Sequence, residues 1–158
     1  MKLTQDMIDM LAAGVAHQVG GCTGGGRPVV CRGLAAQMEE DGRLAVILSG
    51  ESGFEVLAAI RETGRVSVNF THPGTFQSLN LTGRDAVVVH GGTKYRALVD
   101  ARHRAFRDQI APYGFPAAYS TAWYNPPDQD LMAILFTPII ARNQTPGPGA
   151  GNALELRS

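Results

Sequence analysis

The sequence has no excess of charge of either sign and no long apolar run. Its 158 residues include 14 Lys and Arg against 14 Asp and Glu, so no overall field favours nucleic acid or an anionic membrane. No apolar stretch approaches the roughly 20 residues that a membrane-spanning helix needs. The start, MKLTQDMIDMLAAG, is amphipathic and acidic, unlike a secretory signal. We therefore expect a cytoplasmic protein that binds neither membrane nor nucleic acid.

Cysteine is also scarce, since only Cys22 and Cys31 are present, on either side of a glycine-rich stretch. In a reducing cytoplasm two thiols are favoured over a disulfide. Neither cysteine has a histidine or another cysteine at the spacing of metal ligands, so we expect no metal site. No Ser-His-Asp order and no paired carboxylates stand out either, so the sequence names no catalytic residue.

What is present suffices for one hydrophobic core. Hydrophobic residues make up 44% of the chain and charged residues 18%, which is typical of a folded protein, and the length predicts a single domain over 1–158. We expect a helix over 1–13. A Pro/Gly-rich tail over 141–158 contains QTPGPGAGNALEL, which cannot form regular helix or a central strand.

Between these ends, short segments alternate between apolar and polar residues, and this period of two indicates strands. The predicted strands span 14–22, 28–38, 43–49, 65–71, 76–90 and 131–140. Gly83 would let the longest of them bend around a barrel corner. Helical spacing appears over 52–63, with Ser52 as N-cap and Gly64 as its end, and over 94–110. This order favours a mainly β, mostly antiparallel barrel over a doubly wound α/β sheet.

The stretch GCTGGGRPVVCRGLA raises the question of a phosphate-binding loop. It nearly matches the P-loop pattern, but Arg27 stands in place of the lysine and Pro28 in place of the hydroxyl residue. A P-loop also opens a helix, whereas VVCRGLA is β-branched and strand-like. We therefore predict that the glycines form a hairpin turn.

Arg32 allows two interpretations. It lies in an otherwise apolar strand, beside Gly33, where a backbone or a ligand can approach closely. Arg32 is either an arginine on the solvent face of an edge strand or a guanidinium that binds a phosphate.

The order of elements, together with RPVVCRGLAAQ, DGRLAVILS and RVSVNFTHPGTFQSLNLTGRDA, resembles the pyridoxamine 5'-phosphate oxidase-like superfamily of FMN-binding split barrels. The resemblance covers nearly the whole chain and is strongest over 28–86. It implies a six-stranded Greek-key split β-barrel with flanking helices, which forms a homodimer with FMN in two clefts at the subunit interface. It also implies a flavoprotein that oxidises or reduces a small molecule.

The resemblance assigns Arg32 to the FMN phosphate and Gln77 or Ser78 to the edge of the flavin ring. Gln37 and Phe54 stand where the oxidase carries two further phosphate-binding lysines. Ser49, Ser52 and the free amides at the start of the predicted 52–63 helix would assist as an anion-binding pocket. The alternative to an FMN-dependent oxidoreductase is a non-catalytic split-barrel protein, or one that binds haem or deazaflavin and has lost FMN.

Histidines and late aromatic residues complete the candidates. The histidines are His17, His72, His90 and His103. We expect His17 to be a hydrogen-bonded core residue and His103 to lie on a solvated helix face, with haem ligation by one of the four as the alternative. The aromatic residues are Tyr113, Phe115, Tyr119, Trp123 and Tyr124. They favour a dimer interface, and shielding of a flavin ring is the alternative.

Overall fold

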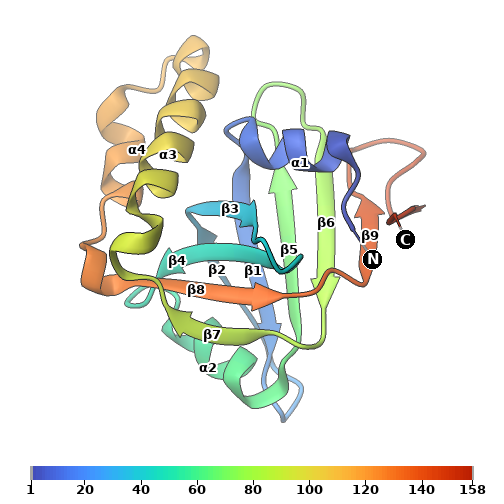
Figure 1. The fold of residues 1–158 in the computed structure, drawn as a ribbon. Helices are drawn as coiled ribbons and strands as arrows, with labels where there is room; N and C mark the ends of the chain where they lie inside the picture. Colours follow the sequence, from blue (N-terminus) through green and yellow to red (C-terminus); the bar gives the residue numbers. More distant parts are fainter. Residues whose placement is uncertain (1, 158) are drawn as a thin grey trace.

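The strands form two antiparallel sheets (Figure 1). The computed structural model describes residues 2–157. One sheet has the order β10-β9-β6-β5-β1-β2, and the other has the order β3-β4-β8-β7. The strands of the first sheet are β1 (Ala16–Cys22), β2 (Pro28–Gly33), β5 (Val66–Thr71), β6 (Ser78–Gly83), β9 (Ile140–Asn143) and β10 (Ala153–Leu154). The strands of the second are β3 (Ala35–Met38), β4 (Leu44–Ser49), β7 (Val87–His90) and β8 (Leu131–Phe136).

Four α-helices flank the sheets within residues 2–157. They are α1 (Gln5–Ala12), α2 (Phe54–Thr63), α3 (Arg96–Ile110) and α4 (Ala117–Tyr124). Helices α3 and α4 lie side by side, while α1 and α2 lie at opposite ends of the sheets (Figure 1). Short 3-10 turns span Gly92–Tyr95, Ala111–Tyr113 and Asp128–Asp130. Helix α4 was not predicted from the sequence.

Two predicted helix caps and two predicted helix starts can be compared with the helices of the structure. The predicted 1–13 and 94–110 helices begin later, at Gln5 and Arg96. Gly64 ends α2 in the left-handed conformation, as expected. The prediction that Ser52 caps α2 is wrong, because the helix begins at Phe54 after Gly53 and has no side-chain cap.

The position of strand β4 between two cores explains why its side chains are apolar on both faces. Leu44, Val46 and Leu48 face a core that is shared with the six-stranded sheet, whereas Ala45 and Ile47 face a second core beneath α3. All five side chains have no exposed surface. The four-stranded sheet is therefore a middle layer, with the core that it shares with the six-stranded sheet on one side and helices α3 and α4 on the other.

The mainly β fold class with antiparallel sheets and flanking helices is confirmed, but the six strands that the resemblance implied are not seen as such. The predicted strand 28–38 divides at Leu34 into β2 and β3, and 76–90 divides after Gly83 into β6 and β7. Each division moves the chain from one sheet to the other. The predicted strand 131–140 likewise ends at Phe136, before β9.

The tail closes the edge of the six-stranded sheet. β9 pairs with β6 on one side and with β10 on the other, so β10 is one edge strand of this sheet and β2 is the other. Lys2 and Arg157 exchange two backbone hydrogen bonds, of 2.7 and 2.8 Å. Among residues 2–157, none of the helices has the length and apolarity that crossing a membrane requires.

Candidate functional site

Three of the five predicted binding residues share one cavity. Arg32 from β2, Ser49 from the end of β4, and Ser52 from the β4–α2 loop line a pocket of about 490 Å³, which we name the Arg32 pocket. Trp123 of α4 and Asp130, directly before β8, also line it.

Arg32 is exposed on the outer face of the edge strand β2 and lies next to Trp123 of α4. Its guanidinium carbon lies 4.0 Å from the centre of the Trp123 ring, a distance at which a cation is attracted to an aromatic face. Within residues 2–157, no carboxylate forms an ion pair with Arg32. The pocket therefore contains a guanidinium whose hydrogen-bond donors remain available to an anionic ligand.

Strand pairing brings Asp130 to the loop after β4. Ser49 is paired with Leu131 across the β4–β8 ladder, so Asp130 lies next to residues 50–52. The Asp130 carboxylate accepts a hydrogen bond from Ser49 Oγ at 2.5 Å and another from the Glu51 amide at 2.8 Å. The Ser52 amide donates to Ser49 Oγ at 3.2 Å. The expectation of free amides at the start of the predicted 52–63 helix is thus wrong for Ser52.

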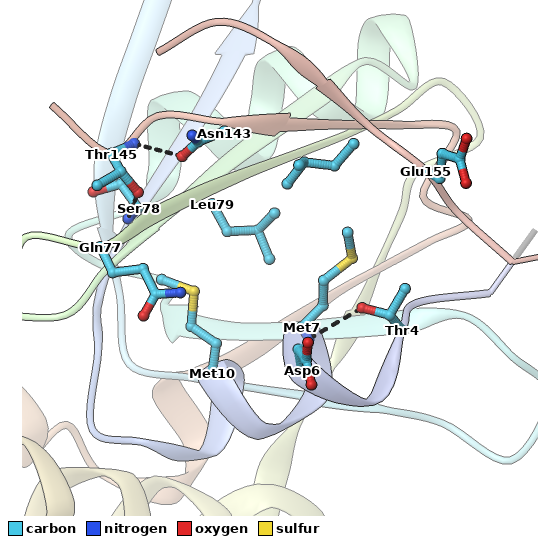
Figure 2. Close-up of a pocket in the computed structure, with 11 residues that line it drawn as sticks. Thr4, Asp6, Met7, Met10, Gln77, Ser78, Leu79, Asn143, Thr145 and Glu155 are labelled. Carbon is cyan, nitrogen blue, oxygen red and sulfur yellow. Dashed lines mark hydrogen bonds between the residues drawn. The ribbon is translucent and has the colours of Figure 1, made fainter. Parts of the chain in front are cut away.

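Gln77 and Ser78 lie elsewhere, in a pocket of about 680 Å³ between α1, the start of β6, β9 and the tail (Figure 2). We name it the α1 pocket. Met7 and Met10 project into it from α1 and Leu79 from β6, and polar side chains surround these apolar groups. No residue lines both the α1 pocket and the Arg32 pocket.

The two polar residues differ in accessibility. Gln77 is exposed, whereas Ser78 is buried. The Ser78 hydroxyl lies 3.0 Å from both Thr71 Oγ1 and the Phe76 carbonyl, and its amide donates to Thr145 Oγ1 at 3.0 Å. Gln77 therefore has the freer side chain for a ligand, and Ser78 mainly joins the tail to β6.

Neither of the two residues at the expected lysine positions lies in the Arg32 pocket. Phe54 is 65% exposed at the start of α2. Gln37 donates to Glu39 at 3.1 Å, and Glu39 pairs with Lys94 at 2.8 Å. Arg32 is consequently the one cation among the residues that line its pocket.

The histidines differ from their predicted roles. His17 is buried as predicted, but neither ring nitrogen has a hydrogen-bond partner, so the expectation of a hydrogen-bonded histidine is wrong. Burial and the nearby Arg102 and Arg32 lower the pKa of His17 to about 3, so the ring is neutral. His103 packs against α4 instead of facing solvent, with Nε2 2.9 Å from Ser120 Oγ and the ring stacked on Tyr124.

The cysteines and the glycine stretch have structural roles. Both cysteines are free, and burial raises the pKa of the Cys31 thiol to about 11. Thr23 to Gly26 form the predicted turn between β1 and β2, with Gly26 in the left-handed conformation. In the part of the chain that the structure describes, no three His, Cys, Asp or Glu side chains gather as metal ligands.

Comparison with known proteins identifies the fold. No family model and no curated protein matches this sequence. HupZ of Group A Streptococcus superposes with a TM-score of 0.58 at 13% identity, over 94% of this chain and 99% of that one. A protein from Clostridium acetobutylicum is related to general stress protein 26 and is of the pyridoxinephosphate oxidase family. It superposes with a TM-score of 0.54 at 14% identity, over 95% of this chain and 92% of that one.

A third similar structure belongs to an FMN-binding protein. A pyridoxamine 5'-phosphate oxidase-related, FMN-binding protein from Nostoc punctiforme gives a TM-score of 0.51 at 14% identity, over 95% of each chain. At such identities the shared feature is the course of the backbone. This chain therefore has the split-barrel fold of the pyridoxamine 5'-phosphate oxidase-like proteins.

Proposed function

We propose that this protein binds FMN between two copies of itself and serves as an oxidoreductase for a small molecule. The observation that carries the proposal is the Arg32 guanidinium, which has no ion pair within residues 2–157 and shares a pocket with Ser49 and Ser52 in a fold common to an FMN-binding protein. Bound FMN would supply the electron chemistry, and the protein would hold and orient it. The two free cysteines support a cytoplasmic location.

The residues fit FMN in part. Arg32 suits a phosphate, because a guanidinium can donate two parallel hydrogen bonds to it. Trp123 offers a flat apolar surface in the same pocket. The Ser49 hydroxyl and the Glu51 amide, however, already donate to Asp130. Arg32 is therefore the main phosphate contact in this proposal, and Ser49 and Ser52 are secondary.

The separation of the two pockets supports a homodimer. A flavin that touched both Arg32 and Gln77 or Ser78 would need surfaces that no single protomer brings together. A second copy would place its α1 pocket beside the Arg32 pocket of the first. Exposed apolar side chains are available for such a contact, including Val30, Phe54 and Phe76.

The test is FMN binding by wild type, Arg32→Ala and Arg27→Ala. The native protein is purified, its visible spectrum is recorded with and without added FMN, and unbound flavin is removed by gel filtration. We expect Arg32→Ala to weaken FMN binding about tenfold or more, the effect of losing a charge-assisted hydrogen bond. Arg27 is the control, because it is exposed and pairs with Glu55 on the surface. Equal FMN affinity of wild type and Arg32→Ala would contradict the assignment of Arg32.

A second candidate is a non-catalytic split-barrel protein that has lost FMN or holds haem or deazaflavin instead. Two observations favour it. Neutral residues, Gln37 and Phe54, stand at the two expected lysine positions, and the Asp130 carboxylate lies among the predicted phosphate donors. A colourless dimer that FMN does not stabilise would support this candidate. Thermal shifts are a sensitive readout, since a ligand at about 100 times its dissociation constant stabilises a protein by about 2.7 kcal/mol.

A further inference from the structure

The Asp130 side chain occupies the position in which the β4–α2 loop would receive an anion. Its Oδ2 accepts from the Ser49 hydroxyl and its Oδ1 from the Glu51 amide, at 2.5 and 2.8 Å. A hydroxyl and a backbone amide that converge in this way are also the donors that proteins use for phosphate oxygens. The loop thus already holds one anion, and that anion belongs to the chain.

The fold fixes Asp130 at this place. The Gly50 amide donates to the Asp130 carbonyl at 2.7 Å, directly beyond the last pair of the β4–β8 ladder. The segment before Asp130 is anchored by Arg96, which pairs with Asp128 at 2.6 Å and donates to the Pro126 carbonyl. The backbone of Asp130 is therefore held from both sides, and only its side chain would have to move for another anion to enter.

The Arg32 pocket contains side chains of opposite charge, which affect an anionic ligand in opposite ways. Arg32 attracts an anion and forms no ion pair with Asp130, although both line the same cavity. A phosphate dianion that approached Arg32 would meet the Asp130 carboxylate beside it, and like charges at short range repel. To use the loop donors as well, the phosphate would have to displace that carboxylate.

We infer that Asp130 is a specificity-determining residue, which competes with a ligand phosphate for the Ser49 hydroxyl and the Glu51 amide and so weakens binding of phosphate-bearing ligands. The inference rests on the proposed function for the identity of the ligand, a flavin. It predicts that the wild-type protein discriminates little between FMN and riboflavin, because the phosphate gains Arg32 but meets Asp130.

The experiment compares wild type, Asp130→Asn, Asp130→Ala and Glu51→Gln. Glu51→Gln is the matched control, since it removes one negative charge from the same pocket, while the Glu51 side chain is exposed and forms no hydrogen bond with the described part of the chain. Circular dichroism and the melting temperature without ligand first establish that each variant is folded. Dissociation constants for FMN and for riboflavin are then measured, and thermal stabilisation by inorganic phosphate is recorded at constant ionic strength.

We expect both Asp130 variants to raise the FMN preference over riboflavin about tenfold, which corresponds to about 1.4 kcal/mol. Inorganic phosphate should stabilise the same two variants more than it stabilises wild type or Glu51→Gln. An unchanged FMN-to-riboflavin ratio with no gain in phosphate binding would overturn the inference, as would an equal gain in Glu51→Gln. If no variant bound either flavin, the proposed function would fail, and the phosphate arm would still decide the role of Asp130.

Discussion

At the scale of single residues, His17 is the most unusual side chain of the core. It is 1% exposed, and both of its ring nitrogens lack partners within residues 2–157. Its neighbours are the Phe70 ring, in an edge-on contact at 5.4 Å, and the positive charges of Arg102 and Arg32. Buried polar atoms without hydrogen bonds are uncommon because their desolvation is uncompensated. Protonation would make this cost larger.

His17 should therefore make the protein sensitive to acid. Its pKa is about 3 in the folded state and about 6.5 in the unfolded chain, so the unfolded state binds the proton first as pH falls. The contribution of neutral His17 to stability is complete above about pH 6.5 and is lost as the pH falls towards 3. Between pH 7 and pH 5 we expect His17 to lower the free energy of unfolding by about 2 kcal/mol. Urea unfolding at both pH values measures this loss.

Two variants isolate the contribution of His17. His17→Leu has no titratable group and should lack this part of the pH dependence. His90→Gln, which changes an exposed histidine, should keep it. If wild type and His17→Leu lost the same stability between pH 7 and pH 5, other groups would govern the acid response.

At the scale of secondary structure, the two strand divisions depend on glycines packed against neighbouring side chains. A Cβ atom on Gly83 would lie 2.4 Å from Phe136 Cδ2, and one on Gly33 would lie 2.9 Å from the Cβ of His17. Such distances are too short for atoms that are not bonded. The glycines let the chain pass from one sheet to the other while the bulky neighbours stay in place.

Gly83→Ala should therefore destabilise the fold by about 1 to 3 kcal/mol, the usual effect of overpacking. Gly25→Ala is the control, because a Cβ atom there meets only Thr23 Oγ1 at 4.0 Å. Thermal unfolding followed by circular dichroism measures both. If Gly83→Ala melted at the wild-type temperature, Phe136 would be free to move and the corner would not depend on a missing side chain.

Local patterns account for most of the predicted elements. Alternation over 65–71 predicted β5, since Val66, Val68 and Phe70 are buried there and the residues between them are only partly covered. Helix α4 was missed because its aromatic residues are not spaced as one apolar stripe. The strand divisions were only partly foreseen, at Gly83, because they depend on contacts between distant residues.

The candidate site was predictable to a lesser degree. Arg32, Ser49 and Ser52 do line one pocket, whereas Gln77 and Ser78 line another. Asp130 was not singled out, because its contact with Ser49 joins residues 81 positions apart and depends on the pairing of β4 with β8. Trp123 was noted only as an aromatic residue, and its position over Arg32 depends on how α4 packs.

At the scale of the whole molecule, the exposed aromatic residues of the α3–α4 hairpin are a candidate contact between subunits. Phe115 and Tyr119 are each 43% exposed, and their rings lie 4.8 Å apart. Tyr119 also contacts Trp123, whose ring lies against the Arg32 guanidinium. A subunit that packed on these rings would thus lie close to the Arg32 pocket.

Light scattering of the native protein should give the mass of a dimer at micromolar concentration. The double variant Phe115→Ser and Tyr119→Ser should shift the protein towards the monomer, because interface aromatic residues contribute a large share of binding energy. Ala118→Ser, on the exposed part of the same helix, is the control. A double variant that remained fully dimeric would place the interface elsewhere.

The middle position of the four-stranded sheet has a consequence for folding. Its β4–β8 ladder joins Leu44 to Phe136 and Ser49 to Leu131, so it cannot form until most of the chain has been brought together. Contacts between such distant residues slow folding, since the entropy of loop closure is lost before they form. Because both cores share this ladder, the barrel and the helical hairpin should melt in one cooperative transition. The amides of β4 should then exchange with solvent only through global unfolding.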